Sequence, residues 1–137
     1  MALFYADTSA LVKLVRDEPE SDALRAFISD AELACCEIGL AEVPRAIRRA
    51  GLHDPDLPLE LLLDRAGEML DAVALLPLDR ALLTIAGSLA EPALRTLDAI
   101  HVAAAAELSP LDGIISYDER QAAVARLAGI RTIAPGT

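Results

Sequence analysis

The 137-residue sequence is poor in side chains that act as general bases or soft metal ligands. It contains two histidines, His53 and His101, a single lysine, Lys13, and two cysteines, Cys35 and Cys36. The cysteines are adjacent and have no histidine at ligand spacing, which excludes a zinc site and favours a buried strand. The scarcity of histidine and lysine favours metal-assisted chemistry over acid–base chemistry by side chains.

The chain also lacks long apolar runs and a basic charge. No apolar run reaches the roughly 18 residues of a membrane span. The first seven residues lack the basic start and long apolar core of a signal peptide, so we expect a cytoplasmic protein that does not bind membranes. The net charge of −10 at pH 7 excludes broad electrostatic capture of nucleic acid. A nucleic-acid substrate would need a metal ion and local arginines to hold it.

Strand-like and helix-like segments alternate along the chain. The pattern predicts strands at 3–6, 32–35, 73–76, 112–116 and 130–133, and helices at 9–16, 20–29, 38–50, 59–70, 79–89, 96–108 and 119–127. This alternation indicates one α/β domain over residues 1–137, built as three α/β/α layers around a mostly parallel sheet. Pro44 predicts a kink or a late start in the 38–50 helix. Leu57 and Leu61 fall outside the apolar face of the 59–70 helix, which indicates a partner surface.

Four carboxylates stand where such a fold would bring them together. Asp7 and Asp118 follow apolar runs, Asp98 opens an alanine-rich helix, and Glu42 lies in the helical stretch after the cysteines. In open α/β sheets, sites form at the carboxyl ends of the strands. Converging acids repel one another, and a hard divalent cation with oxygen ligands is the usual compensation. The pattern therefore predicts metal-assisted chemistry on a phosphate.

Three of these acids have ordinary structural explanations as well. Asp7 is a good N-cap for the helix that follows it. Asp98 would lie in the first turn of a helix capped by Thr96, where a negative charge is favourable. Asp118 forms a capping-box pattern with Gln121. Against this, the helix after Asp98 is too apolar to face water, and a half-buried carboxylate is costly without a partner.

The fourth acid, Glu42, could pair with Arg45 or Arg49 on the helix surface. Arg45, Arg48 and Arg49 form the only local basic cluster, which is either a solvated helix face or a contact for phosphate close to Glu42.

Polar residues beside the acids are candidates for orienting them. Thr8, Ser9 and Ser116 could hydrogen-bond a carboxylate or a bound water, or could simply serve turns and caps. His101 lies one turn after Asp98, and we interpret it as an imidazole packed beside the site, bonded to backbone or to an acid, rather than as a metal ligand.

Four segments carry a family resemblance in order along nearly the whole chain. Residues 5–14, 40–46, 97–105 and 115–120 resemble the acid-bearing motifs of PIN domains, and the size and N-terminal form resemble the VapC-type toxins of toxin–antitoxin modules. The resemblance implies an endoribonuclease dependent on Mg²⁺ or Mn²⁺, with Asp7, Glu42, Asp98 and Asp118 as metal ligands. It also implies a homodimer inhibited by a cognate antitoxin. Glu119 is a candidate for a further acid, and Ser116 stands where the family often has threonine.

The resulting hypothesis is hydrolysis of an RNA phosphodiester by water activated by one or two divalent ions. A receiver-like signalling domain also clusters acids at strand ends, but it needs a lysine after a late strand, and Lys13 lies in the first predicted helix. A catalytically silent PIN-like module that binds only protein remains open.

Overall fold

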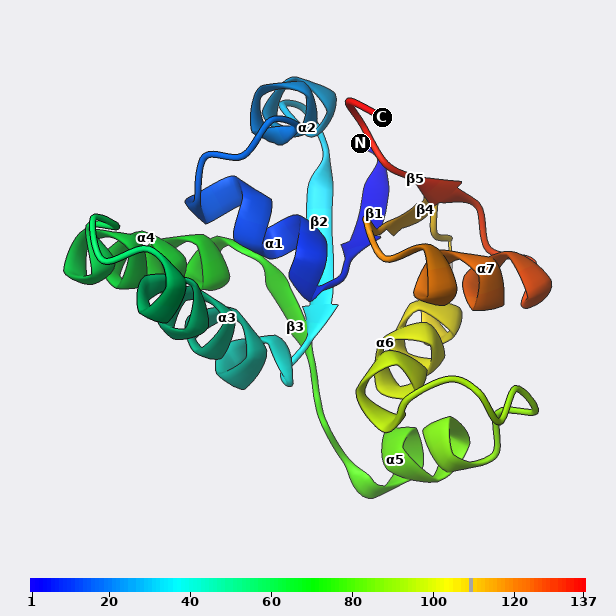
Figure 1. The fold of residues 1–137 in the computed structure, drawn as a ribbon. Helices are drawn as coiled ribbons and strands as arrows, with labels where there is room; N and C mark the ends of the chain where they lie inside the picture. Colours follow the sequence, from blue (N-terminus) through cyan, green and yellow to red (C-terminus); the bar gives the residue numbers. More distant parts are fainter. Residues whose placement is uncertain (109) are drawn as a thin grey trace.

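A parallel five-stranded sheet forms the centre of the protein, as a computed structural model that describes residues 1–108 and 110–137 shows (Figure 1). The strands are β1 (Leu3–Ala6), β2 (Glu32–Cys36), β3 (Ala74–Leu76), β4 (Gly113–Ile115) and β5 (Thr132–Ile133), in the order β3-β2-β1-β4-β5. All four strand pairs are parallel, so every carboxyl end faces the same edge. The predicted parallel α/β sheet is confirmed.

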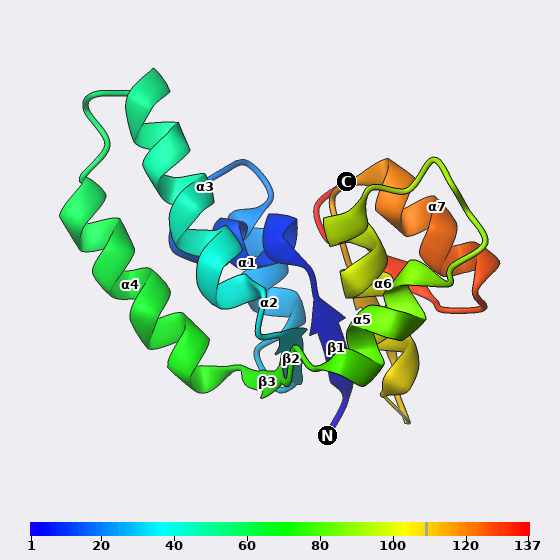
Figure 2. The ribbon, with the colours of Figure 1, turned by 90° about the horizontal axis from the view of Figure 1, so that it is seen from below.

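Helices cover both faces of this sheet. They are α1 (Thr8–Val15), α2 (Ser21–Phe27), α3 (Gly39–His53), α4 (Leu59–Ala72), α5 (Arg80–Gly87), α6 (Thr96–Glu107) and α7 (Glu119–Leu127). Helices α1 to α4 lie on one side and α5 to α7 on the other (Figures 1 and 2). This is the predicted three-layer architecture. The strand order differs from the 2-1-3-4-5 order of receiver-type sheets, which disfavours the receiver alternative.

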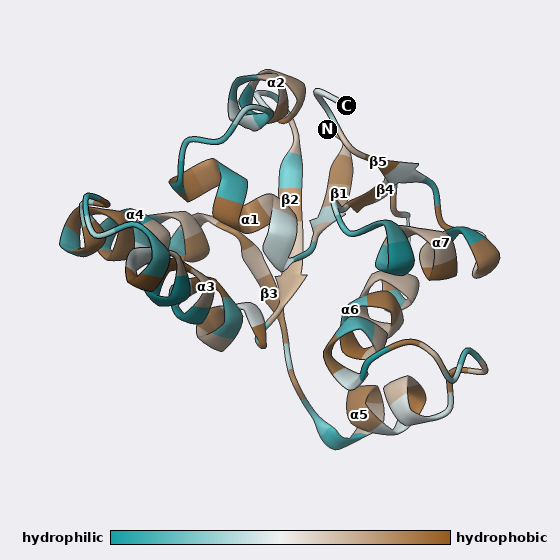
Figure 3. Ribbon diagram, in the orientation of Figure 1, coloured by the Kyte–Doolittle hydropathy of each residue, from teal (hydrophilic) through white to brown (hydrophobic). Residues whose placement is uncertain are grey.

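The central strand β1 is enclosed on both sides and on both faces. Phe4, Tyr5 and Ala6 are buried, because β2 and β4 flank β1 and helices cover both of its faces. Figure 3 shows the strands as mostly apolar, whereas α3 and α4 alternate between apolar and polar residues. A strand buried on both faces reads as a continuous apolar run, which is why residues 3–6 were recognisable in the sequence.

Helix α6 packs directly on the sheet. Residues 99–105 are all buried, and the small alanines among them let the α6 backbone lie close to β2. The helix thereby carries Asp98, in its first turn, to the carboxyl edge of the sheet.

Some local predictions were wrong. Helix α3 begins at Gly39, so Pro44 does not delay its start. The packing of Val43 and Ile47 in the core outweighs the single hydrogen bond that proline cannot make. Leu57 packs against the core instead of facing a partner, whereas Leu61 is 48% exposed. Within residues 1–108 and 110–137, none of the helices has the length and apolar character needed to cross a membrane.

Candidate active site

Asp7 is the most buried of the four acids, with 2% of its surface exposed. It follows the end of β1 and is the N-cap of α1, where its Oδ1 accepts a hydrogen bond from the Ala10 amide (3.0 Å). Hydroxyls of Ser9 and Ser116 donate to Oδ1 and Oδ2, each at 2.5 Å. Burial raises the pKa of Asp7, and these three hydrogen bonds oppose that rise. The capping and site roles of Asp7 are therefore combined in one side chain.

The same two serines connect β1 to the segment after β4. The Ser9 hydroxyl accepts from the Tyr117 amide (2.9 Å), and the Ser116 hydroxyl accepts from the Asp118 amide (3.1 Å). Two strands that are neighbours in the sheet are thus joined by side-chain hydrogen bonds at their carboxyl ends.

Glu42 faces the site from α3 and is held by one residue of α1, on its own side of the sheet, and by one residue of α6, on the opposite side. Its Oε1 accepts from the Thr8 hydroxyl (2.7 Å) and from Nε2 of His101 (2.6 Å). Burial would raise the pKa of Glu42, but the hydrogen bonds and charge of His101 outweigh it and lower the pKa. The predicted surface pair with Arg45 or Arg49 is wrong, because Glu42 turns toward His101 instead.

His101 has both ring nitrogens engaged and is only 2% exposed. Because an ionised Glu42 can only accept, Nε2 carries a proton. Nδ1 shares a hydrogen bond of 2.7 Å with the Tyr5 hydroxyl, which also accepts from the Cys36 amide (3.0 Å). Burial alone would lower the pKa of His101, but its hydrogen bonds and the Glu42 charge raise it above its ordinary value. His101 is placed to orient Glu42, with no free nitrogen for a metal.

Asp98 is half-buried in the first turn of α6. Its Oδ1 accepts a hydrogen bond from Nε2 of Gln121 on α7 (3.1 Å). Burial raises the pKa of Asp98, and the negative charges of Asp118 and Glu42 raise it further. The predicted cap at Thr96 is wrong: Arg95 is the N-cap residue and Thr96 is already helical, without a side-chain cap.

Asp118 is the N-cap of α7, and its Oδ1 accepts from the amides of Arg120 (3.0 Å) and Gln121 (3.4 Å). The capping box is incomplete, because the Gln121 side chain reaches Asp98 instead of the Asp118 amide. Gln121 is therefore a site residue that was read from the sequence only as a cap. Its Oε1 is buried without a hydrogen-bond partner among the described residues.

The remaining candidates lie at the periphery. Arg45, Arg48 and Arg49 line a cavity of about 310 Å³ on α3 together with Leu52 and Leu59. None of the three arginines makes an ion pair with the described part of the chain.

Glu119 pairs with Arg126 at 2.6 Å on the exposed side of α7. Its carboxylate is therefore engaged away from the other acids.

The four acids are neighbours electrostatically but do not form a closed cage. The charges of Asp118 and Glu42 raise the pKa of Asp98, and the charge of His101 lowers the pKa of Asp7. Within the described ranges, no three Asp, Glu, His or Cys side chains stand close enough to hold a metal ion. The donor set nevertheless suits a hard cation, since it offers only carboxylate oxygens. Burial raises the pKa of Asp98 first and the charges of Asp118 and Glu42 raise it further, and a bound cation would oppose all three effects.

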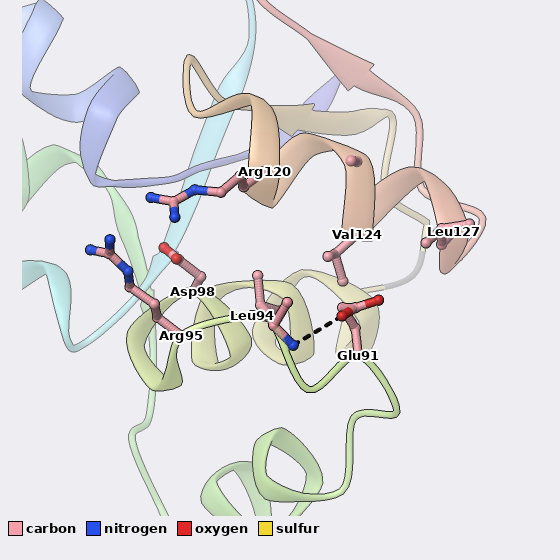
Figure 4. Close-up of a pocket in the computed structure, with 9 residues that line it drawn as sticks. Glu91, Leu94, Arg95, Asp98, Arg120, Val124 and Leu127 are labelled. Carbon is pink, nitrogen blue, oxygen red and sulfur yellow. Dashed lines mark hydrogen bonds between the residues drawn. The ribbon is translucent and has the colours of Figure 1, made fainter.

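A cavity of about 300 Å³ opens beside Asp98 (Figure 4). The loop before α6 and one face of α7 form its walls, which are mainly apolar. Arg95 and Arg120 lie near Asp98, and Leu94, Val124 and Leu127 lie further along.

A buried acid at the end of the central strand, with three more acids around the carboxyl edge of a parallel sheet, defines a PIN-type α/β domain. The PIN domain model matches residues 4–127, and the chain belongs to the PIN-domain family, with VapC-type ribonucleases among its relatives.

Three curated relatives span almost the whole chain. Ribonuclease VapC47 of Mycobacterium tuberculosis (strain CDC 1551 / Oshkosh) is 34% identical, with 98% of each chain covered. Ribonuclease VapC35 of the same strain is 37% identical, again with 98% of each chain covered. Ribonuclease VapC46 of M. tuberculosis (strain ATCC 25618 / H37Rv) is 38% identical and covers 98% of this chain and 99% of its own.

Two solved structures share the fold. M. tuberculosis VapC20, described as a toxin that cleaves the sarcin–ricin loop, superposes with a TM-score of 0.72 at 15% identity, covering 98% of this chain and 100% of its own. A chain of VapBC2 from Rickettsia felis, bound to a DNA fragment from its promoter, gives a TM-score of 0.69 at 12% identity, covering 97% and 98%. At these identities the likeness establishes the fold.

Proposed function

We propose that this protein is a metal-dependent endoribonuclease and the toxin of a toxin–antitoxin pair. The observation that carries the proposal is the buried Asp7 carboxylate at the end of β1, held by three donors, one of which, Ser116, also bonds the Asp118 amide. Asp98 in turn interacts electrostatically with Asp118 and Glu42. An acid kept buried at the end of a strand, against the cost of burial, is typical of a functional site.

The four acids would hold one or two Mg²⁺ or Mn²⁺ ions. Such an ion lowers the pKa of a water nucleophile and neutralises charge on the phosphate. Ser9, Ser116 and the Ala10 amide fix the Asp7 carboxylate. Thr8 and His101 both bind Oε1 of Glu42, and Oε2 makes no hydrogen bond with the described part of the chain.

Two groups limit how protons move at this site. Both nitrogens of His101 are hydrogen-bonded, so this histidine is not the base that accepts a proton from water. Burial of Tyr5 raises its pKa, so its hydroxyl stays protonated beside His101. The side chains therefore orient the carboxylates, in keeping with the scarcity of histidine and lysine in the sequence.

The substrate and partners follow from the same features. The acidic chain needs local positive charge to hold RNA, and Arg45, Arg48 and Arg49 supply it on the helix that carries Glu42. A homodimer and a cognate antitoxin are proposed from the VapC relatives and from the VapBC2 structure of R. felis, which contains such a pair.

The competing candidate is a catalytically silent module that binds only an antitoxin-like protein. The absence of a preformed three-ligand group among the described residues favours it. Calorimetry with Mn²⁺ separates the two: an active enzyme binds the ion, and replacing Asp7 with asparagine weakens that binding.

The direct experiment incubates the purified chain, free of partner, with total cellular RNA and Mg²⁺ or Mn²⁺, and maps the new RNA ends. EDTA and Asp7→Asn should each abolish cleavage. Asp71→Asn, which changes an exposed acid near the end of α4, should leave cleavage intact. Full cleavage by Asp7→Asn, or in EDTA, would overturn the assignment.

A further inference from the structure

We infer that the cavity beside Asp98 is a specificity pocket for one nucleobase of single-stranded RNA, next to the cleaved phosphate, and that it prefers guanine. The inference rests on the proposed ribonuclease function and adds to it a residue-level account of which RNA sequence is cut.

The position of the cavity links it to the reaction centre. Asp98 lines one end of the cavity, and the apolar walls extend from there along α7 (Figure 4). A second cavity of about 290 Å³ shares Glu91, Val124 and Leu127 with the first, so the apolar surface continues beyond it. Leu127 is 80% exposed, which leaves an apolar lip open to solvent. A group bound here would lie directly beside a phosphate held by the acids.

The charges at the Asp98 end suit a nucleotide better than an apolar side chain. The guanidinium groups of Arg95 and Arg120 lie close to the Asp98 carboxylate in Figure 4. Within residues 1–108 and 110–137, neither side chain makes an ion pair. Two cations at the mouth of an apolar pocket complement the phosphates on either side of an inserted base.

The pocket has to bind a base without an aromatic platform. The chain has no tryptophan and only four other aromatic residues. Phe4 and Phe27 pack together, Tyr5 is buried against His101, and Tyr117 covers Lys13. A guanidinium plane can replace an aromatic ring in stacking on a base, and Arg95 and Arg120 are the planar groups at this cavity.

Glu91 gives the pocket a means to distinguish bases. It lies at the end of the cavity away from Asp98, and its Oε1 accepts a hydrogen bond from the Ala93 amide (2.9 Å), which fixes the carboxylate. Oε2 makes no hydrogen bond with the described residues. A carboxylate accepts N–H donors from the Watson–Crick edge of a base, and guanine offers two adjacent donors, N1–H and the N2 amine. The geometry therefore favours guanine over the other three bases.

The test uses single-stranded RNA randomised around one position, with sequencing of the products. The wild type should cut with guanine enriched on one side of the new end, and inosine there, which lacks the N2 amine, should lower kcat/KM by about tenfold. Glu91→Gln keeps the acceptor for the Ala93 amide and should remove the preference. Glu107→Gln, at the exposed end of α6, is the matched control and should retain it.

A filling variant tests the cavity itself. Val124→Phe should raise KM for all RNAs while leaving Mn²⁺ binding at the acids unchanged. An unaltered base preference in Glu91→Gln, or no preference in the wild type, would overturn the inference while leaving the nuclease assignment intact. Absence of any RNA cleavage by the wild type would instead refute the proposed function. If Val124→Phe blocks binding of a protein partner and spares cleavage, the cavity belongs to that partner and the inference fails.

Discussion

Nε2 of His101 lies 2.6 Å from Oε1 of Glu42, and this contact joins α6 to α3 across the carboxyl edge of the sheet. The two helices lie on opposite faces of the sheet, so the pair connects the two outer layers at the site.

Replacing His101 with alanine should damage both stability and activity. The change removes one hydrogen-bond partner from Glu42 and one from the Tyr5 hydroxyl and opens a cavity, so we expect a loss of about 3 kcal/mol in the free energy of unfolding. Denaturant unfolding measures this loss. His101→Gln can keep one hydrogen bond and should recover part of the stability. In both variants Mn²⁺ affinity should fall about 10- to 100-fold, because His101 no longer orients Glu42. Unchanged Mn²⁺ affinity in both variants would contradict the orienting role.

Asparagine and alanine at position 7 should differ in stability although both abolish cleavage. Burial raises the pKa of Asp7, so its ionised form is less stable in the folded chain than in the unfolded chain, and this penalty is absent at low pH. Asn caps a helix as well as Asp does and carries no charge, so Asp7→Asn should melt at or above the wild-type temperature at pH 7. Asp7→Ala loses the cap and should be less stable than Asp7→Asn by about 0.5–2 kcal/mol. A lower melting temperature for asparagine than for alanine would contradict this account.

Gln121→Leu should separate activity from stability. The replacement removes the hydrogen bond to Asp98 and also removes the buried, unpaired Oε1, so the free energy of unfolding should change by less than about 1 kcal/mol. Cleavage should fall because Asp98 loses the group that orients it. Gln121→Glu, which places a second carboxylate against Asp98, is expected to lower stability at pH 7. Cleavage at the wild-type rate by Gln121→Leu would show that this contact has no part in the reaction.

The Lys13 cluster should produce a pH-dependent contribution to stability. Nζ of Lys13 lies 2.9 Å from Glu20, and the hydrogen bond from Lys13 lowers the pKa of Glu20 in the folded chain. Because the pKa of Glu20 is lower in the folded chain than its unfolded value of about 4.5, ionised Glu20 stabilises the fold at pH values above 4.5. This stabilisation is lost as the pH falls through the lowered pKa of the folded chain. In Lys13→Met this part of the acid dependence should disappear. If the free energy of unfolding of the wild type and of Lys13→Met changes in parallel from pH 6 to pH 3, the Lys13–Glu20 contact does not contribute to the pH dependence of stability.

The arginines of α3 should determine how cleavage depends on salt. Each phosphate contact that is lost should reduce the slope of log affinity against log salt by about 0.7 for a single strand. Arg49→Gln is therefore expected to weaken RNA binding and flatten this slope, as measured by titration of RNA into Asp7→Asn protein. Arg131→Gln, an exposed arginine close to β5, is the control. If the slope of log affinity against log salt is the same for Arg49→Gln and Arg131→Gln, the RNA does not contact the arginines of α3.

The elements of the fold were predictable because buried parallel strands and alanine-rich helices leave strong local patterns. Residues 3–6 and 113–115 are continuous apolar runs. The acids that follow them, Asp7 and Asp118, lie at the same edge of the sheet. Strand order was not predictable in this way, because pairing depends on contacts between distant segments such as Tyr5 with Ala34 and Ile114.

The partners of the site residues were harder to predict than the acids themselves. Glu42 has arginines three and seven residues away, yet it binds His101, which lies 59 residues along the chain. Gln121 fits a capping pattern locally, yet its side chain crosses to Asp98 on α6. Helical spacing describes neighbours on one helix, and both side chains instead satisfy a group on another helix, which only the packing of α3, α6 and α7 determines.

The Ser116 hydroxyl donates to the Asp7 carboxylate and accepts from the Asp118 backbone amide, so one oxygen atom connects the two acidic residues. A substitution there cannot affect either acid alone. Threonine keeps a hydroxyl on the same carbon and can preserve both bonds, whereas alanine removes both at once. Effects of mutations at Asp7 and Ser116 should accordingly fail to add, because the hydroxyl of one residue bonds the carboxylate of the other.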